Sequence, residues 1–374
     1  MPQSTKHILL LSSWYPTAEN PFLGNFVQRN AELLGSKFQV SVITIEPSKT
    51  VSKITLSDEN DGNLRTITVL FPEGNRFQNW TRKHKAFKKG LTQIESVHLI
   101  IGHVLLPNAW MFLEATRRKK APLIWVEHGS YFRSELNKKW SPYEKWLLRR
   151  IVAISKEIVA VSETLKSDLK PFTDGKNISI IGNHIDEKLF TFEVKERTNT
   201  IKFLHVSTLD ENVKNPKGIF EACFLLKEKN PNFELTVISD GDYEHWERLI
   251  QELDLQNQVR FVGPLNWHEI PKYYHQADAF VLFSEYETFS IVLAEALATG
   301  TPIISTNVGI AKGLSEDVIE LVERSNVQEL QTKMLAFINS ELKFDSDTIL
   351  AEGTQFYSTS ILKKWDALIE KYAR

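Results

Sequence analysis

The chain has 374 residues, a formal net charge of −2, and a composition that is 42% hydrophobic, 25% charged and 11% aromatic. This length exceeds the usual size of a single domain, so we expect two globular domains. The single cysteine, Cys223, excludes a disulfide within the chain and fits a reducing compartment. No long apolar segment predicts a signal peptide or a membrane span. We therefore expect a cytoplasmic protein, or one that is peripheral at the inner membrane face.

The first half of the chain alternates short apolar runs with amphipathic stretches such as Asn25–Leu34 and Trp110–Arg118. This rhythm predicts a parallel sheet with helices on both faces. Within Ile54–Val69, the polar insert Ser57–Asn63 predicts a hairpin-like turn. The predicted strands are His7–Leu11, Phe38–Ile45, Val97–Ile101, Leu123–Val126 and Ile158–Val161.

A second series of the same kind follows the loop-like segment Glu187–Thr200, which predicts a linker. The fold class is therefore α/β, with two doubly wound domains. We expect an N-terminal domain over residues 1–186, a C-terminal domain over 187–355, and a final helical segment over 356–374 that packs back on the N-terminal domain. The predicted strands of the second domain are Ile201–Val206, Phe233–Ile238, Val259–Phe261, Ala279–Phe283, Pro302–Ser305 and Val318–Val322.

Positive charge is concentrated in the first domain. Between Arg76 and Arg150 there are 16 lysines and arginines against 5 acidic residues, and the cations alternate with tryptophans such as Trp80 and Trp146. This mixture suits an anionic membrane surface or a phosphorylated acceptor. The alternative is a solvated helix face with its tryptophans packed inward. We expect no nucleic-acid partner.

The stretch from Ser284 to Pro302 carries the most chemical information. It follows the predicted buried strand and becomes a helix whose residues from Ile291 to Ala298 are all apolar except Glu295. Burying an unpaired carboxylate costs several kcal/mol, so Glu295 should have a partner or face a site. Glu287 lies eight residues earlier, at the helix entrance. Because ligands gather outside the carboxyl ends of parallel strands, this arrangement predicts a binding site.

The Glu-x7-Glu pattern of Glu287 and Glu295 resembles the signature of the retaining glycosyltransferases of family 4. The resemblance extends over most of the chain and implies the GT-B fold, in which two Rossmann-like domains surround a cleft. The other motifs that carry it, in chain order, are Ser12–Pro16 with Gly24–Val27, Glu127–Gly129, Val161–Leu165, Asn183–Asp186 with Phe190, and Gly263–Leu265.

The resemblance implies a role for each carboxylate and for the helix start. Glu295 would bind the ribose hydroxyls of a nucleotide-diphosphate sugar, and Glu287 would contact hydroxyls of the transferred sugar. The backbone N–H groups of Phe289, Ser290 and Ile291 would receive the diphosphate. The acceptor would be a glycan or a lipid-linked sugar bound by the N-terminal domain, as in the synthesis of bacterial-type polysaccharides or glycolipids.

Other residues match the family motifs in the same way. Lys214 corresponds to a lysine that neutralises the diphosphate as the bond breaks, and Gly24 would let the backbone approach the same group. His128 corresponds to a histidine beside the donor sugar, and Leu265 lies in the turn that contacts the base. The resemblance implies that no metal and no further cofactor is required.

The chain departs from the family pattern at three places. The usual arginine after the first strand of the second domain is replaced by Thr208, so Lys214 would carry the diphosphate charge. His184 stands at the glycine of the linker motif, and Gly309-Ile310 replaces a Gly-Gly pair.

Two other functions are open at this point. A catalytically weak sugar-nucleotide-binding protein would explain Thr208. A glycoside hydrolase could use Glu287 and Glu295 as a carboxylate pair, although a loop and a buried helix suit nucleotide binding better.

Overall fold

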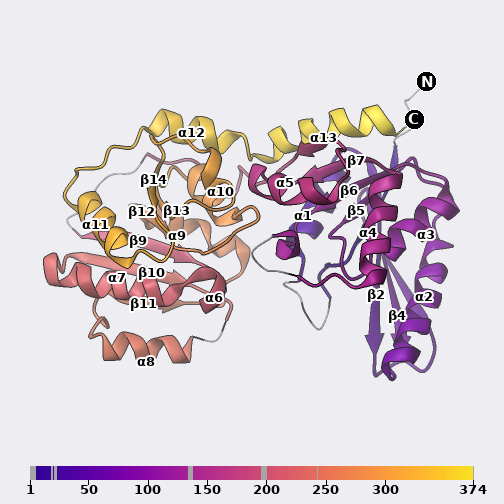
Figure 1. Ribbon diagram of the computed structural model, residues 1–374, viewed down its shortest axis with the longest axis horizontal. Coiled ribbons are helices and arrows are strands. Elements are labelled where there is room, and N and C mark those ends of the chain that lie inside the picture. The colour runs from indigo at the N-terminus through magenta and orange to yellow at the C-terminus, as the bar shows by residue number, and fades with distance from the viewer. Residues whose placement is uncertain are drawn as a thin grey trace. The chain divides into compact units, whose positions relative to one another are not determined.

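The structure is a computed structural model, and it describes residues 6–17, 20, 23–133, 138–194, 200–241 and 243–373. The chain divides into two units, each with its own sheet (Figure 1). The N-terminal unit contains residues 1–161, 165–183 and 362–374, and the C-terminal unit contains residues 162–164 and 184–361. The last residues of the chain therefore belong to the N-terminal unit, and the short segment Ser162–Thr164 belongs to the C-terminal unit.

The sheet of the N-terminal unit has eight strands in the order β3-β4-β2-β1-β5-β6-β7-β8. Neighbours are parallel except for the antiparallel pair β3 and β4. The strands are β1 (His7–Ser12), β2 (Gln39–Ser48), β3 (Thr55–Asp61), β4 (Leu64–Pro72), β5 (Leu99–His103), β6 (Leu123–Glu127), β7 (Ser155–Ala160) and β8 (Ile178–Ile180).

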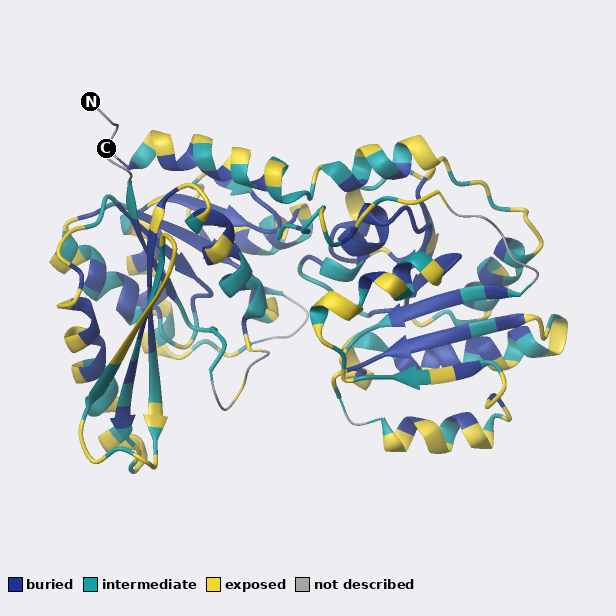
Figure 2. Ribbon diagram, turned by 180° about the vertical axis from the view of Figure 1, so that it is seen from behind, coloured by how far each residue is buried: buried dark blue, intermediate teal, exposed yellow. Residues whose placement is uncertain are grey.

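Apolar side chains on both faces explain the central strands. In β1 the four residues Ile8–Leu11 are fully buried, and they pair in register with Leu99–Gly102 of β5. A strand covered by helices on both sides favours such a continuous apolar run. The predicted strands of this half are confirmed, and Figure 2 shows their buried residues inside the unit.

The hairpin differs from the prediction in its extent. The turn consists of Gly62 and Asn63 only, and most of the polar insert predicted as a turn is strand β3. This strand lies at the sheet edge, where polar side chains remain in solvent, so a polar sequence is compatible with a strand. Arg65 of β4 binds Asp58 of β3 at 2.6 Å across the hairpin.

Helices cover both faces of this sheet. Gly35 of α1 packs against Leu64, whereas Gly90 of α2 packs against Ile43 and Val69, on the opposite face of the same strands. A capping box by Asn75 begins α2, and another by Ser141 begins α4. The α-helices are α1 (Asn25–Gly35), α2 (Arg76–Leu91), α3 (Trp110–Lys119), α4 (Pro142–Ile154) and α5 (Glu163–Leu169).

The sheet of the C-terminal unit has six strands, all parallel, in the order β11-β10-β9-β12-β13-β14. Every strand predicted for this half is present, within one or two residues at each end. They are β9 (Ile201–Val206), β10 (Phe233–Ile238), β11 (Val259–Val262), β12 (Ala279–Leu282), β13 (Ile303–Thr306) and β14 (Ile319–Val322).

Two groups of helices enclose this sheet. The helices α7, α8 and α11 share one hydrophobic core with one strand face. On the other face, Tyr274 of α9 packs against Phe280 of β12, and α10 contacts α9 and α12. The helices of this unit are α6 (Glu211–Lys214), α7 (Pro216–Lys229), α8 (Glu244–Glu252), α9 (Pro271–Gln276), α10 (Ile291–Ala298), α11 (Val327–Ile338) and α12 (Ser346–Thr354). The last helix, α13 (Ser358–Tyr372), belongs to the N-terminal unit from Leu362 on.

The predicted linker Glu187–Thr200 is only partly a connecting segment. Phe190 is fully buried and packs against Trp267 and Tyr274, so the beginning of this segment is anchored in the C-terminal unit. Residues 195–199 lie outside the described part of the chain. No helix in the described ranges combines the length and the apolar character that a bilayer crossing requires.

Candidate functional site

The loop between β12 and α10, residues 283–290, leaves the carboxyl end of a central strand and is held from several sides. The carbonyl of Ser284 accepts a hydrogen bond from the Thr306 hydroxyl at 2.6 Å. Farther along, the Phe289 carbonyl accepts the N–H of Ile310 at 2.9 Å, and the Thr288 carbonyl accepts the hydroxyl of Ser162. Contacts from distant parts of the sequence therefore fix the loop before any ligand arrives.

Hydrogen-bond donors converge where this loop enters α10. Ser290 adopts a left-handed conformation, with φ of 69°. Its N–H and those of Phe289 and Ile291 make no hydrogen bond within the described part of the chain. The Ser290 hydroxyl is buried and has no partner among the described residues. Free N–H groups at the positive end of a helix dipole can bind an anion. That these three residues hold a diphosphate stays a prediction.

A cation lies at the same loop. The Lys214 ammonium, at the end of α6, binds the Glu287 carboxylate at 2.5 Å, and Ser284 donates to the same oxygen at 3.1 Å. Only 19% of the lysine side chain and 11% of the glutamate side chain are exposed. The sequence assigned these residues to different parts of a ligand, whereas the structure joins them directly. Because an ammonium has three donors, Lys214 can keep this contact and still bind an anion.

Glu295, on α10, is 3% exposed and has a partner, as its apolar surroundings require. The hydroxyl of Tyr274 donates to its Oε2 at 3.0 Å, and the Val292 carbonyl lies 3.1 Å from the same hydroxyl. Burial and the adjacent carboxylate raise the pKa of Tyr274 well above its ordinary value. The tyrosine therefore remains a donor and fixes one oxygen of Glu295.

The carboxyl end of β9 forms a turn around Thr208, which is exposed. His205, just before it, binds the Val281 carbonyl through Nδ1 at 2.9 Å and the Ser207 hydroxyl through Nε2 at 2.8 Å. Because a carbonyl only accepts, Nδ1 carries the proton and Nε2 accepts from Ser207. Burial lowers the pKa of His205 to about 4. A neutral imidazole thus ties the Thr208 turn to β12.

Leu265 lies in the turn after β11 and is half-buried. This turn approaches β10 closely, since a Cβ on Gly263 would lie 2.4 Å from the Ser239 carbonyl. Thr208 and Leu265 therefore follow strands of the same sheet edge as Glu287. The structure brings Glu287 and Lys214 into contact and places Phe289, Ser290, Ile291 and Glu295 along one helix; it shows no contact that joins Thr208 or Leu265 to that group.

In the N-terminal unit, His128 follows β6 and is 8% exposed. Its Nε2 lies 3.0 Å from Nδ1 of His103, and its ring packs against Phe26 with 4.6 Å between centroids and a tilt of 33°. Burial lowers the pKa of His103 to about 3 and that of His128 well below its ordinary value. Both rings are therefore neutral, and His128 can act through a neutral ring or its backbone but not as a cation.

Glu127 organises this pair. It is fully buried, and its Oε1 accepts the N–H groups of His128 and Gly129 at 2.8 and 2.7 Å. Its Oε2 accepts from the Leu105 N–H at 3.0 Å and the Tyr131 hydroxyl at 2.9 Å. Burial raises the pKa of Glu127, and these hydrogen bonds oppose the shift. The carboxylate joins the loops after β5 and β6 and so sets the position of His128.

Gly24 begins α1 with φ of 69°. A Cβ there would lie 2.5 Å from the backbone of Trp14. A contact within the N-terminal unit therefore explains why this position requires glycine: the chain before α1 packs against the backbone of the loop after β1. Its predicted approach to a diphosphate remains a prediction.

Sequence reasoning missed several residues that shape these sites. Tyr274, His205 and Ser162 act through partners far along the chain, which no spacing pattern pairs. Glu127 binds its neighbours His128 and Gly129 and the more distant Leu105 N–H, and its motif alone did not mark it as a site residue. Within the described ranges, no three histidine, cysteine or acidic side chains are arranged to hold a metal ion.

Two family models match the chain, one to each half. The model described as Glycosyltransferase Family 4 matches residues 24–189, and the model described as Glycosyl transferases group 1 matches residues 186–352. Together they span both units. They support the resemblance found from the motifs and leave the glycoside-hydrolase alternative without support.

Individual relatives agree with this result. The glycogen synthase of Mycobacterium tuberculosis is 27% identical over 350 residues, which cover 83% of this chain and 80% of the relative. The structure of sucrose-phosphate synthase from Thermosynechococcus elongatus superimposes with a TM-score of 0.77 at 17% identity, and each chain is covered to 98%. An Escherichia coli structure described as trehalose-6-phosphate bound with UDP-2-fluoro glucose gives 0.76 at 12% identity, covering 98% of this chain and 99% of that one. These likenesses confirm the fold class, two Rossmann-like units of GT-B type.

Proposed function

Because this chain belongs to the group 1 glycosyltransferases of family 4, we propose that it moves a sugar from a nucleotide-diphosphate donor to a glycan or lipid-linked acceptor. We further propose that the anomeric configuration is retained and that no metal is needed. The observation that carries the proposal is the anion site at the start of α10, with its free N–H groups and the unpartnered Ser290 hydroxyl.

In this proposal the C-terminal unit binds the donor. The N–H groups of Phe289, Ser290 and Ile291 hold the diphosphate, and Lys214 neutralises the charge that grows on it as the glycosidic bond breaks. Glu287, fixed by Lys214 and Ser284, accepts hydrogen bonds from the sugar hydroxyls. A fixed site needs no reorganisation when charge develops, which is how preorganised donors lower a barrier.

The other residues complete the donor site in this proposal. Glu295 accepts from the ribose through Oε1, the oxygen that Tyr274 does not bind, while Leu265 and the turn around it contact the base. We keep for His128 the role that the resemblance implies, a place beside the donor sugar. It contacts the sugar through its neutral ring or its backbone carbonyl. A positive charge near the anomeric carbon then finds no imidazolium to repel it.

The test is a donor panel. The protein is incubated with a panel of glycan and lipid-linked acceptors and with the glucose, galactose, mannose and N-acetylglucosamine derivatives of UDP, GDP, ADP and TDP, and released nucleotide and glycosylated acceptor are measured by mass spectrometry with and without EDTA. We expect turnover of at least one donor, unchanged by EDTA, and an α-linked product by NMR when the donor is α-linked. A β-linked product from an α-linked donor would overturn retention, and full loss with EDTA would overturn metal independence.

Exposed aromatic side chains support a membrane-side acceptor. Phe77 and Trp80 on α2 stack on each other and are 73% and 58% exposed, and Tyr143 and Trp146 on α4 stack likewise and are 52% and 51% exposed. The alternative of inward-packed tryptophans is therefore wrong for Trp80 and Trp146. Helix α2 contains no acidic residue. Aromatic rings among cations suit the interface of an anionic bilayer, so we propose peripheral binding there from the cytoplasmic side.

Co-sedimentation with vesicles tests the membrane proposal. We expect the wild type to pellet with phosphatidylglycerol vesicles at low salt and to be released at high salt. The double variant W80S/W146S should bind much less, whereas F224S, which changes an exposed aromatic ring of the C-terminal unit, should bind like the wild type. Equal binding of the double variant and the wild type would contradict the proposal.

A catalytically weak sugar-nucleotide-binding protein remains a second candidate, because of one observation. Thr208 supplies no charge, and the ammonium of Lys214 is already paired with Glu287, so the diphosphate meets less net positive charge than in relatives with an arginine. Nucleotide binding without turnover of any donor in the panel would favour this candidate.

A further inference from the structure

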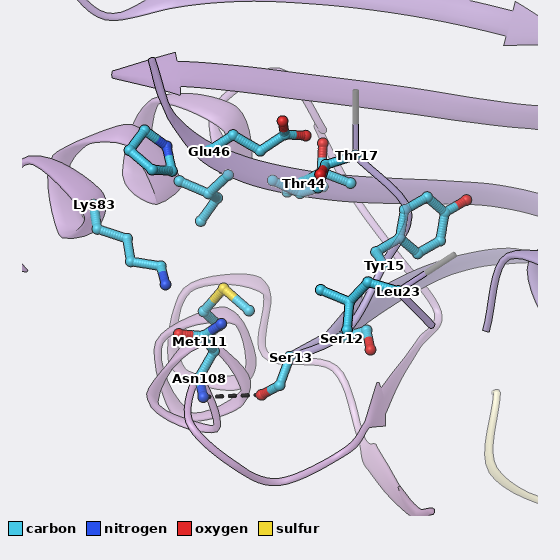
Figure 3. Close-up of a pocket in the computed structure, with 13 residues that line it drawn as sticks. Ser12, Ser13, Tyr15, Thr17, Leu23, Thr44, Glu46, Lys83, Asn108 and Met111 are labelled. Carbon is cyan, nitrogen blue, oxygen red and sulfur yellow. Dashed lines mark hydrogen bonds between the residues drawn. The ribbon is translucent and has the colours of Figure 1, made fainter. Parts of the chain in front are cut away.

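The N-terminal unit has a pocket at the carboxyl end of β1 that the donor site does not use (Figure 3). Its volume is about 180 Å³. Ser12 and Ser13 form its floor, and β2, which extends beyond β1, forms one wall with Thr44 and Glu46. The helices α2 and α3 close the other side with Lys83 and Met111.

Lys83 points into this pocket from the middle of α2 (Figure 3). Its ammonium makes no hydrogen bond and no ion pair with any described residue. The residue is half-buried, and this burial lowers the pKa of Lys83. A lysine that loses water without gaining a counter-ion destabilises the fold. A methionine of similar length would fill the same space without that cost, so the charge itself needs an explanation.

The rest of the lining combines apolar side chains, such as Ile43 and Met111, with polar groups that suit hydroxyls. Asn108 lies in the loop before α3 and lines the pocket. Its backbone N–H donates to the Ser13 hydroxyl at 2.9 Å. Thr17 and the carboxylate of Glu46 line it as well. Amide, hydroxyl and carboxylate groups around a small pocket are typical of sugar binding, and a single cation among them selects a negative charge.

We propose that this pocket binds an acidic sugar unit of the acceptor, whose carboxylate or phosphate pairs with Lys83. The inference rests on the proposed function, in which the N-terminal unit receives the acceptor. Because Lys83 supplies one positive charge, a group with one negative charge, such as a uronate carboxylate or a phosphodiester, fits better than a doubly charged phosphate. The acceptor class is therefore an acidic saccharide.

Binding is measured without any donor, so that the result does not depend on donor turnover. Methyl α-glucuronide, glucose 6-phosphate and methyl α-glucoside are titrated into the full chain by ligand-observed NMR. We expect the glucuronide to bind at least about 10-fold more tightly than the glucoside, since one charge-assisted hydrogen bond separates them. Of the two acidic sugars, the glucuronide should bind better; a preference for glucose 6-phosphate would overturn the assignment of a single negative charge.

The variant K83M tests the residue, and K88M, an exposed lysine on the same helix, is the matched control. K83M should lose about 10-fold or more in glucuronide affinity, keep its weak glucoside affinity, and unfold at the same or a higher temperature. K88M should bind as the wild type does. Equal binding of glucuronide and glucoside, wild-type binding by K83M, or no binding of either acidic sugar at 10 mM would overturn the inference. None of these outcomes would bear on donor turnover in the panel described above, so the proposed function is tested separately.

Discussion

The substitution E295Q tests the most specific role in the donor site. Glu295 is 3% exposed, and Tyr274 donates to one of its two carboxylate oxygens. Glutamine has the same shape, so its amide oxygen can accept from Tyr274 and keep the fold. The amide nitrogen then replaces the oxygen that we assign to the ribose hydroxyls.

The size of the effect follows from that replacement. A hydrogen bond to a charged acceptor contributes about 1.5–3 kcal/mol, and the variant offers a donor where an acceptor is needed. Nucleoside diphosphate binding should therefore weaken about 10- to 150-fold. The control E228Q removes an exposed carboxylate on α7 and should bind like the wild type.

Calorimetry with a nucleoside diphosphate and its 2′,3′-dideoxy analogue isolates the ribose contact. The wild type should prefer the hydroxylated ligand, and E295Q should bind both ligands with nearly equal, weak affinity. If E295Q kept the wild-type preference for the hydroxylated ligand, the role that we assign to Glu295 would be refuted.

Three further predictions concern the groups that hold the sites in place. G309A should lower the free energy of unfolding by more than about 2 kcal/mol in chemical denaturation, because Gly309 has φ of 55° and a Cβ would lie 2.4 Å from the Phe289 carbonyl; an unchanged midpoint would contradict this. E127Q should lower the free energy of unfolding by about 2–5 kcal/mol in the same assay, since an amide group would face donors that now bind a buried carboxylate; near-wild-type stability would show that the carboxylate does not hold the loops after β5 and β6 together. The folded-state pKa of His205, about 4, lies below its unfolded value near 6.5, so its stabilising contribution is complete above pH 6.5 and is lost as the pH falls toward 4. At pH 5 the loss should be about 2 kcal/mol, and H205Q should lack this part of the pH dependence; parallel stability profiles of variant and wild type would contradict it.

The strands could be predicted because burial on both faces leaves continuous apolar runs, as in β1 and β12. Polar edge strands leave no such pattern. For this reason β3 was predicted as a turn, and the three-residue strand β8 was not predicted. In both cases pairing with a neighbouring strand, rather than the local sequence, determines the conformation.

The candidate site was predictable where its residues are close in sequence, as Glu287, Ser290 and Glu295 are. The contact of Lys214 with Glu287 spans 73 positions, and that of Ser162 with Thr288 spans 126. Such pairs depend on how the strands are ordered in the sheet, which no local spacing encodes. Lys83 was hidden for another reason: it is one of several basic residues on α2, and only the structure shows that it lies in a pocket.

The central claim is that the start of α10, with Lys214, binds the diphosphate of a nucleotide sugar, and calorimetric titration of the whole protein with UDP, GDP, ADP and TDP tests it most directly. We predict that at least one of the four binds with one-to-one stoichiometry, and that K214M weakens this binding about 10-fold or more, whereas K229M, at the far end of α7, leaves it unchanged. If none of the four nucleotides binds at millimolar concentration, or if K214M binds as tightly as the wild type, the claim is contradicted.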